Sequence, residues 1–60
     1  MSKKLVAVRD LPTGHRLEPD DIAIKSPGDG LPPYELDKII GKRLVKELKE
    51  DENISFTVVE

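Results

Sequence analysis

The chain has 60 residues, of which 37% are charged, and its formal net charge is −2. It contains no cysteine, so neither disulfides nor thiolate metal sites can stabilise it. Its basic and acidic residues are interspersed, whereas a nucleic-acid-binding surface requires a basic cluster. No apolar run approaches the ~18 residues of a membrane span, and no stretch has the apolar h-region of a signal peptide. We therefore expect one small cytoplasmic domain with neither a nucleic-acid nor a membrane partner.

Short strands and tight turns are predicted in the first part of the chain. The apolar run at residues 5–8 is rich in β-branched side chains and predicts a buried strand. Residues 11–14 (Leu-Pro-Thr-Gly) are typical of a turn. At residues 18–22, a proline followed by two aspartates predicts a single helical turn, because carboxylates favour the positive end of a helix. Residues 23–25 predict a second short strand.

A loop rich in glycine and proline leads into a short helix in the middle of the chain. The loop starts at Lys25, and Pro33 suits the first position of the helix that follows it. A one-sided apolar stripe continues the helix, and Gly41 suits its C-terminal end. The residues of that stripe are Leu36, Ile39 and Ile40. A helix of about two turns is stable only if its stripe is buried.

The last part of the chain resembles the first. Residues 8–11 (Val-Arg-Asp-Leu) match residues 45–48 (Val-Lys-Glu-Leu) in polarity and in charge sign. The same offset matches Leu17 with Ile54, Ile22 with Val59, and the turn Pro12-Thr13-Gly14 with Lys49-Glu50-Asp51. Neither unit could bury its apolar face alone, so two units would pack about a pseudo-two-fold axis. Chance similarity between short β-rich segments is the alternative.

We therefore expect a small, mostly-β domain over residues 1–60 with an internal repeat and short helical turns. Its half-units would span about residues 5–24 and 42–60, and the loop and helix over 25–41 would join them.

Four features could carry chemistry, and each has a structural explanation. His15 could act as a general base but sits at a turn tip, where we expect a solvated side chain. Asp20-Asp21 and Glu50-Asp51-Glu52 could bind a metal, but neither has the ligand spacing of a calcium loop. Gly28-Asp29-Gly30 could offer backbone N–H groups to an anion, although it lacks phosphate-loop spacing. A helix start, exposed turns and a connecting loop account for all four.

Two stretches of the chain resemble known families. Residues 6–22 (Val-Ala-Val-Arg-Asp-Leu-Pro-Thr-Gly through Leu-Glu-Pro-Asp-Asp-Ile) resemble the SAF domain pattern of assembly proteins, sugar-acid dehydratases and type III antifreeze proteins. Residues 25–42, with Lys-x-Pro-Gly-x-Gly followed by Pro-Tyr-Glu-Leu-Asp-Lys-Ile-Ile-Gly-Lys, resemble the C-terminal antifreeze-like domain of bacterial sialic acid synthases. The resemblance implies a β-clip fold with pseudo-symmetric halves, in agreement with the repeat.

The resemblance also implies a role in N-acetylneuraminate biosynthesis. In that family a separate barrel domain condenses phosphoenolpyruvate with N-acetylmannosamine by means of a divalent metal. The antifreeze-like domain binds no cofactor of its own. It swaps across a homodimer and caps the partner's barrel, with its glycine-rich loop facing the amino-sugar. This chain would then be a non-catalytic part of a transferase, because the barrel is not in these 60 residues.

The loop expected to face the substrate comprises Lys25, Ser26, Pro27, Gly28, Asp29 and Gly30. In the family an arginine precedes the Pro-Gly pair and contacts the amino-sugar, and Ser26 occupies that position here. A serine hydroxyl can neither reach as far as a guanidinium nor supply its charge. The loop therefore retains the residues that set its shape and lacks the expected polar contact.

Two other functions are compatible with the same fold. One is an ice-binding antifreeze protein, although charged residues such as Arg9, Asp10 and Lys46 oppose ordered contact with an ice plane. The other is a general SAF interaction module of an assembly protein.

Overall fold

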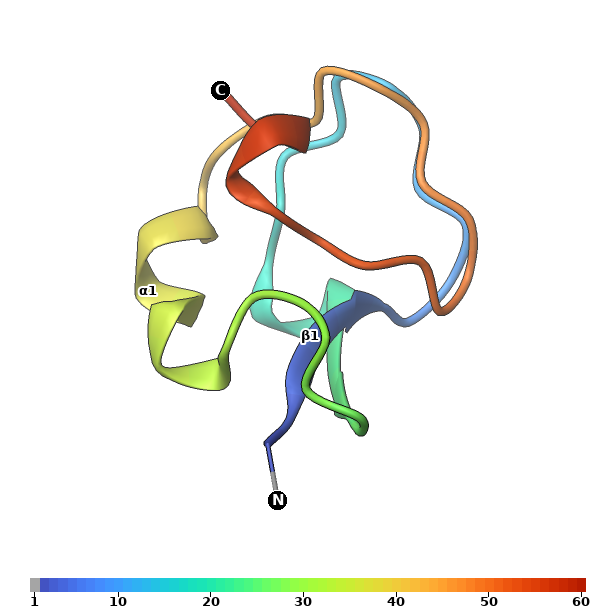
Figure 1. Cartoon of the computed structure of the whole chain (residues 1–60). Coiled ribbons are helices and arrows are strands. Elements are labelled where there is room, and N and C mark those ends of the chain that lie inside the picture. Colours follow the sequence, from blue (N-terminus) through green and yellow to red (C-terminus); the bar gives the residue numbers. More distant parts are fainter. Residues whose placement is uncertain (1) are drawn as a thin grey trace.

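The computed structural model describes residues 2–60 and contains a two-stranded antiparallel sheet. Strand β1 (Lys4–Ala7) pairs with β2 (Ile22–Lys25), so that Lys4 lies opposite Lys25 and Ala7 lies opposite Ile22. The helical elements of the described residues are the 3₁₀ turns η1 (Pro19–Asp21), η2 (Pro33–Glu35) and η3 (Phe56–Val58) and the α-helix α1 (Leu36–Ile39). The other described residues form turns, bends, isolated bridges and irregular segments (Figure 1).

The short elements lie within a residue or two of their predicted positions. Both predicted strands are present as β1 and β2, and the helical turn predicted at residues 18–22 is η1. The predicted central helix is present as η2 followed directly by α1. It ends where Gly41 adopts a φ of +86°, the left-handed conformation that glycine accepts most readily.

The segments at residues 8–14 and 45–51 run side by side, as the light-blue and orange parts of Figure 1 show. The N–H of Leu11 donates to the carbonyl of Leu48 at 2.8 Å, and the N–H of Leu48 donates back at 2.9 Å. Other backbone hydrogen bonds of one half have a counterpart in the other half, at the spacing that separates Leu11 from Leu48. The N–H of Gly14 donates to the carbonyl of Leu44, and the N–H of Asp51 donates to that of Ala7. The same relation holds for Leu17 to Lys42 and Ile54 to Leu5, and for Val8 to Asp21 and Val45 to Val58.

The turns at the ends of these segments also correspond. Gly14 and Asp51 occupy equivalent positions and both have positive φ, +86° and +70°. Such a conformation costs an ordinary L-residue about 1–2 kcal/mol, and aspartate is one of the side chains that accept it.

The core lies between the paired segments and the central helix. Its buried apolar side chains come from both halves and from α1, and they are Leu5, Val6, Ala7, Leu11, Leu17, Ile39, Leu44, Leu48 and Ile54. Ile39 is fully buried, which explains why so short a helix forms at all. Among residues 2–60, no helix has the length and apolar character needed to cross a bilayer.

Candidate functional site

The 25–30 loop leaves the end of β2 and returns beside the start of β1. It is anchored where it ends, because the N–H of Leu5 donates to the carbonyl of Leu31 at 3.0 Å. The Ser26–Pro27 peptide bond is cis. Residues 25–29 are exposed, whereas Gly30 is half-buried. The structure therefore places the predicted site residues together on the surface at one end of the sheet.

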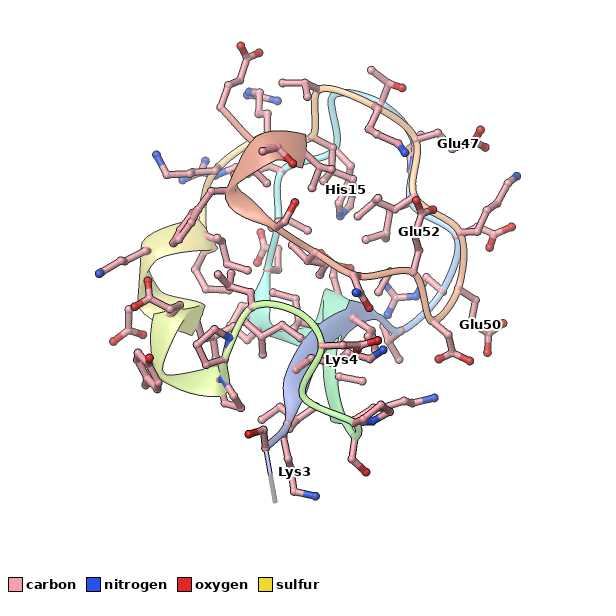
Figure 2. The ribbon with its side chains drawn as sticks, in the orientation of Figure 1. Lys3, Lys4, His15, Glu47, Glu50 and Glu52 are labelled. Carbon is pink, nitrogen blue, oxygen red and sulfur yellow. The ribbon has the colours of Figure 1, made fainter. Side chains whose placement is uncertain are left out.

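Asp29 is turned toward β1. Its Oδ1 accepts a hydrogen bond from Nζ of Lys4 at 2.7 Å, and Figure 2 shows Lys4 beside the loop. The side chain of Lys4 is only 16% exposed, against 66% for Asp29, so the lysine stem is covered while the pair meets at the surface. The hydrogen bond from Lys4 lowers the pKa of Asp29 below its usual value. Asp29 is thus an anchor of the loop.

Both glycines of the loop are closely approached by other parts of the chain. A Cβ on Gly28 would lie 2.7 Å from the carbonyl carbon of Ser2 and 2.9 Å from its Cα. A Cβ on Gly30 would lie 3.1 Å from Nδ2 of Asn53 and 3.3 Å from Cβ of Lys4. At Gly28 the loop can lie this close to the chain beneath it only because the position lacks a side chain, whereas a Cβ on Gly30 would require a small shift of Asn53 or Lys4.

Lys25 is paired with the second half of the chain. Its Nζ donates to Oδ1 of Asp51 at 2.6 Å, and both side chains are about half exposed. The hydrogen bond to Asp51 and its charge raise the pKa of Lys25. The neighbouring Ser26 is exposed. Whether the loop faces a substrate stays a prediction.

A cluster of hydrogen-bonded side chains is centred on Asp21, and the sequence did not indicate it. This carboxylate is buried, with 5% of the residue exposed. Its Oδ2 lies 2.8 Å from Nε2 of His15 and accepts a hydrogen bond from the N–H of Glu18 at 2.9 Å. Its Oδ1 pairs with the guanidinium of Arg9. Asp21 therefore ties together the first turn, η1 and the segment after β1.

Asp21 is ionised more readily than an ordinary aspartate. Burial by itself would raise its pKa, but the hydrogen bonds from His15, from the N–H of Glu18 and from Arg9 outweigh burial and lower it. The prediction that His15 is a solvated turn residue is wrong, because its side chain is partly buried against Asp21. The Glu18–Asp21 spacing, which is that of a helix N-terminal capping motif, is the one signal that could have indicated a bonded carboxylate here.

Two of the three acidic residues of the second turn accept hydrogen bonds from neighbouring donors, and the N–H of the third, Glu50, donates to Oδ1 of Asp10 at 2.8 Å. Asp51 pairs with Lys25, and Glu52 accepts from the N–H of Lys49 at 2.9 Å and from Nζ of Lys46 at 3.2 Å. In Figure 2 the labelled Glu50 and Glu52 lie along this turn. Within residues 2–60, no three acidic or histidine side chains are placed to share a metal ion. The turn is thus explained by charge pairing within the chain.

Comparison with known proteins identifies the family. The model of the SAF domain matches residues 4–60. This chain belongs to the SAF domain family. A similar solved structure is the solution structure of an antifreeze protein like domain in the human N-acetylneuraminic acid phosphate synthase gene. That domain is 28% identical with a TM-score of 0.92, and the match covers 98% of this chain and 76% of the human one. No curated protein matches by sequence.

The match to the human domain agrees with the resemblance to antifreeze-like domains of sialic acid synthases. It supports the SAF fold over nearly the whole chain, including the 25–30 loop. The prediction of a small domain with short antiparallel strands and few helical turns is confirmed.

Proposed function

We propose that this SAF domain is the non-catalytic, substrate-capping module of an enzyme of the sialic acid synthase type. The observation that carries the proposal is the similarity to a domain encoded in a human N-acetylneuraminic acid phosphate synthase gene. At 28% identity over 98% of the chain, the similarity extends beyond a shared fold to sequence.

The structure of the 25–30 loop supports the placement of the substrate contact there. Asp29 and Lys25 are held by ion pairs, so the loop presents a defined surface. The hydroxyl of Ser26 is exposed at the position that carries arginine in the sialic acid synthases. In this proposal Ser26 offers a neutral, short hydrogen-bonding group to the amino-sugar.

The rest of the reaction is assigned to other parts of the enzyme. A barrel domain would condense phosphoenolpyruvate with N-acetylmannosamine, and the divalent metal would be bound there. This domain would lie over the barrel of the partner subunit in a domain-swapped homodimer. We also propose that the domain has the β-clip fold, with halves related by a pseudo-two-fold axis. The paired hydrogen bonds between Leu11 and Leu48 support that symmetry.

The test is a chimera in which this domain replaces the antifreeze-like domain of a sialic acid synthase. Condensation is measured for the barrel alone, for the chimera and for the parent enzyme, with the amino-sugar concentration varied. The proposal predicts that the chimera turns over faster than the barrel alone and has a lower amino-sugar KM. A chimera no more active than the barrel alone, although folded and dimeric, would contradict it.

A further inference from the structure

The 25–30 loop rests on two segments that are far apart in the sequence. One runs from Ser2 into the start of β1 and includes Lys4, the first residue of that strand. The other contains Asn53, which forms an isolated antiparallel bridge with Val6 of β1. That bridge places the two segments side by side, and they form a continuous support beneath the loop.

Three consecutive loop residues contact this support. Gly28 lies against the backbone of Ser2, and Gly30 lies against Lys4 and Asn53. Between them, Asp29 uses its carboxylate to accept from Lys4 at 2.7 Å and its carbonyl to accept from Asn53 Nδ2 at 3.3 Å. The backbone of the loop is thus fixed at Asp29 by two donors from different segments.

We propose that Lys4 and Asn53 are positioning residues that set the shape of the substrate-facing loop. They act through Asp29, which is turned toward the support and away from any ligand above the loop. The group left to contact a ligand is then the hydroxyl of Ser26, three residues before the anchor. The catalytic consequence rests on the proposed function, whereas the effect on the loop is a property of this chain alone.

A merely structural ion pair would affect the stability of the whole domain rather than the order of the loop. Asp29 is 66% exposed, so its pair contributes little to global stability. Its loss should instead loosen the loop locally, because Asp29 would then keep only the weaker hydrogen bond from Asn53 Nδ2 to its carbonyl, at 3.3 Å. The two roles are therefore separated by measuring loop order and thermal unfolding on the same variants.

The first measurement is the backbone ¹⁵N–¹H heteronuclear NOE of residues 28–30 in the 60-residue chain. Lys4→Met, Asn53→Ala and Asp29→Asn should each lower these NOE values while the rest of the domain stays unchanged. Asp29→Asn is nearly isosteric and exposed, so it keeps the test valid if Lys4→Met fails to fold. The matched controls are Lys3→Met and Asp37→Asn, both at exposed positions, which should leave the loop as ordered as in the wild type.

The charge-swapped double variant Lys4→Asp/Asp29→Lys should recover the NOE values that either single reversal loses. Unchanged loop NOE values in both Asp29→Asn and Asn53→Ala would overturn the proposal. So would equal loosening of the loop in the two control variants.

The second measurement uses the chimera with a sialic acid synthase barrel. Asp29→Asn should raise the amino-sugar KM by roughly threefold, the size expected for an exposed ion pair, and leave kcat within about twofold. Asp37→Asn should change neither constant. A wild-type chimera without activity would count against the proposed function, and the NOE results would still test the positioning of the loop. An active chimera whose amino-sugar KM does not respond to Asp29→Asn would overturn the catalytic part.

Discussion

Lys4 and Lys25 lie directly opposite one another in the β1–β2 ladder, and each is paired with an aspartate from a different segment. Like charges facing each other across two strands destabilise a sheet. Here Asp29 of the loop neutralises Lys4, and Asp51 of the second turn neutralises Lys25. The charge arrangement at this end of the sheet thus connects the 25–30 loop to both halves of the chain.

Asp21 should be the most important charged residue for stability. Asp21→Asn removes the buried charge that Arg9 and His15 contact, and we expect it to lower the free energy of unfolding by about 2 kcal/mol. Asp20→Asn is the matched control, because Asp20 lies in the same turn but is exposed. Urea unfolding at pH 7 measures both. If the free energy of unfolding fell by the same small amount in both variants, the contacts of Asp21 with Arg9 and His15 would not stabilise the domain.

The same carboxylate makes stability depend on pH. Its pKa in the folded state lies below the ordinary value of 3.8, so the unfolded chain binds the proton more readily. The stabilisation is therefore complete above that value and is lost as the pH falls through the folded-state pKa. Urea midpoints should decrease on going from about pH 5 to about pH 2. This decrease in the urea midpoint should be smaller in Asp21→Asn than in Asp20→Asn. If the two variants showed the same dependence of the midpoint on pH, Asp21 would not be the source of the pH dependence.

The proposed equivalence of the two halves predicts that Leu11 and Leu48 contribute equally to the core. Leu11 and Leu48 are 2% and 0% exposed and exchange backbone hydrogen bonds, so Leu11→Ala and Leu48→Ala should each cost about 3 kcal/mol. Because that loss approaches the stability of so small a domain, unfolding is compared in a stabilising osmolyte. Val45→Ala, at a position that is 45% exposed, is the control and should cost much less. A large difference between the two leucine variants would argue against equivalent halves.

Gly14 is expected to be needed for its backbone conformation alone. A Cβ added to Gly14 would meet no other part of the chain within 4 Å, so there is space for a side chain. The φ of Gly14 is nevertheless +86°, which L-residues rarely adopt. Gly14→Ala should therefore cost about 1 kcal/mol, and Gly14→Asn less, because asparagine accepts this region better. Thermal unfolding of the two variants decides the point. Alanine tolerated as well as asparagine would mean that the turn adopts another conformation.

The sequence predicted the order of the short elements because their signals are local. Apolar β-branched runs, proline at helical first positions and the stripe ending at Gly41 each depend on a few neighbouring residues. The match between the segments that contain Leu11 and Leu48 was also visible in the sequence, because their side chains agree in polarity and charge sign. These features needed no knowledge of distant contacts.

The contacts that shape the 25–30 loop and the Asp21 cluster could not be predicted from such local signals. Gly28 and Gly30 indicated a loop of special shape, but not that Ser2 and Asn53 lie beneath it. Likewise, the capping spacing could suggest a bonded Asp21, but only the path of the first turn brings His15 to it. Such contacts depend on how the chain returns on itself, which local patterns do not specify.

The claim that the 25–30 loop faces an amino-sugar is tested most directly by Ser26→Arg. In the chimera with a sialic acid synthase barrel, this substitution introduces the guanidinium that the resemblance to sialic acid synthases implies at this position. A charge-assisted contact is worth about 1.5–3 kcal/mol, so we expect the KM for N-acetylmannosamine to fall by about tenfold or more. Thr57→Arg adds the same charge at an exposed position in η3 and is the control. A KM and kcat that do not respond to Ser26→Arg, or that respond equally to both variants, would contradict the account.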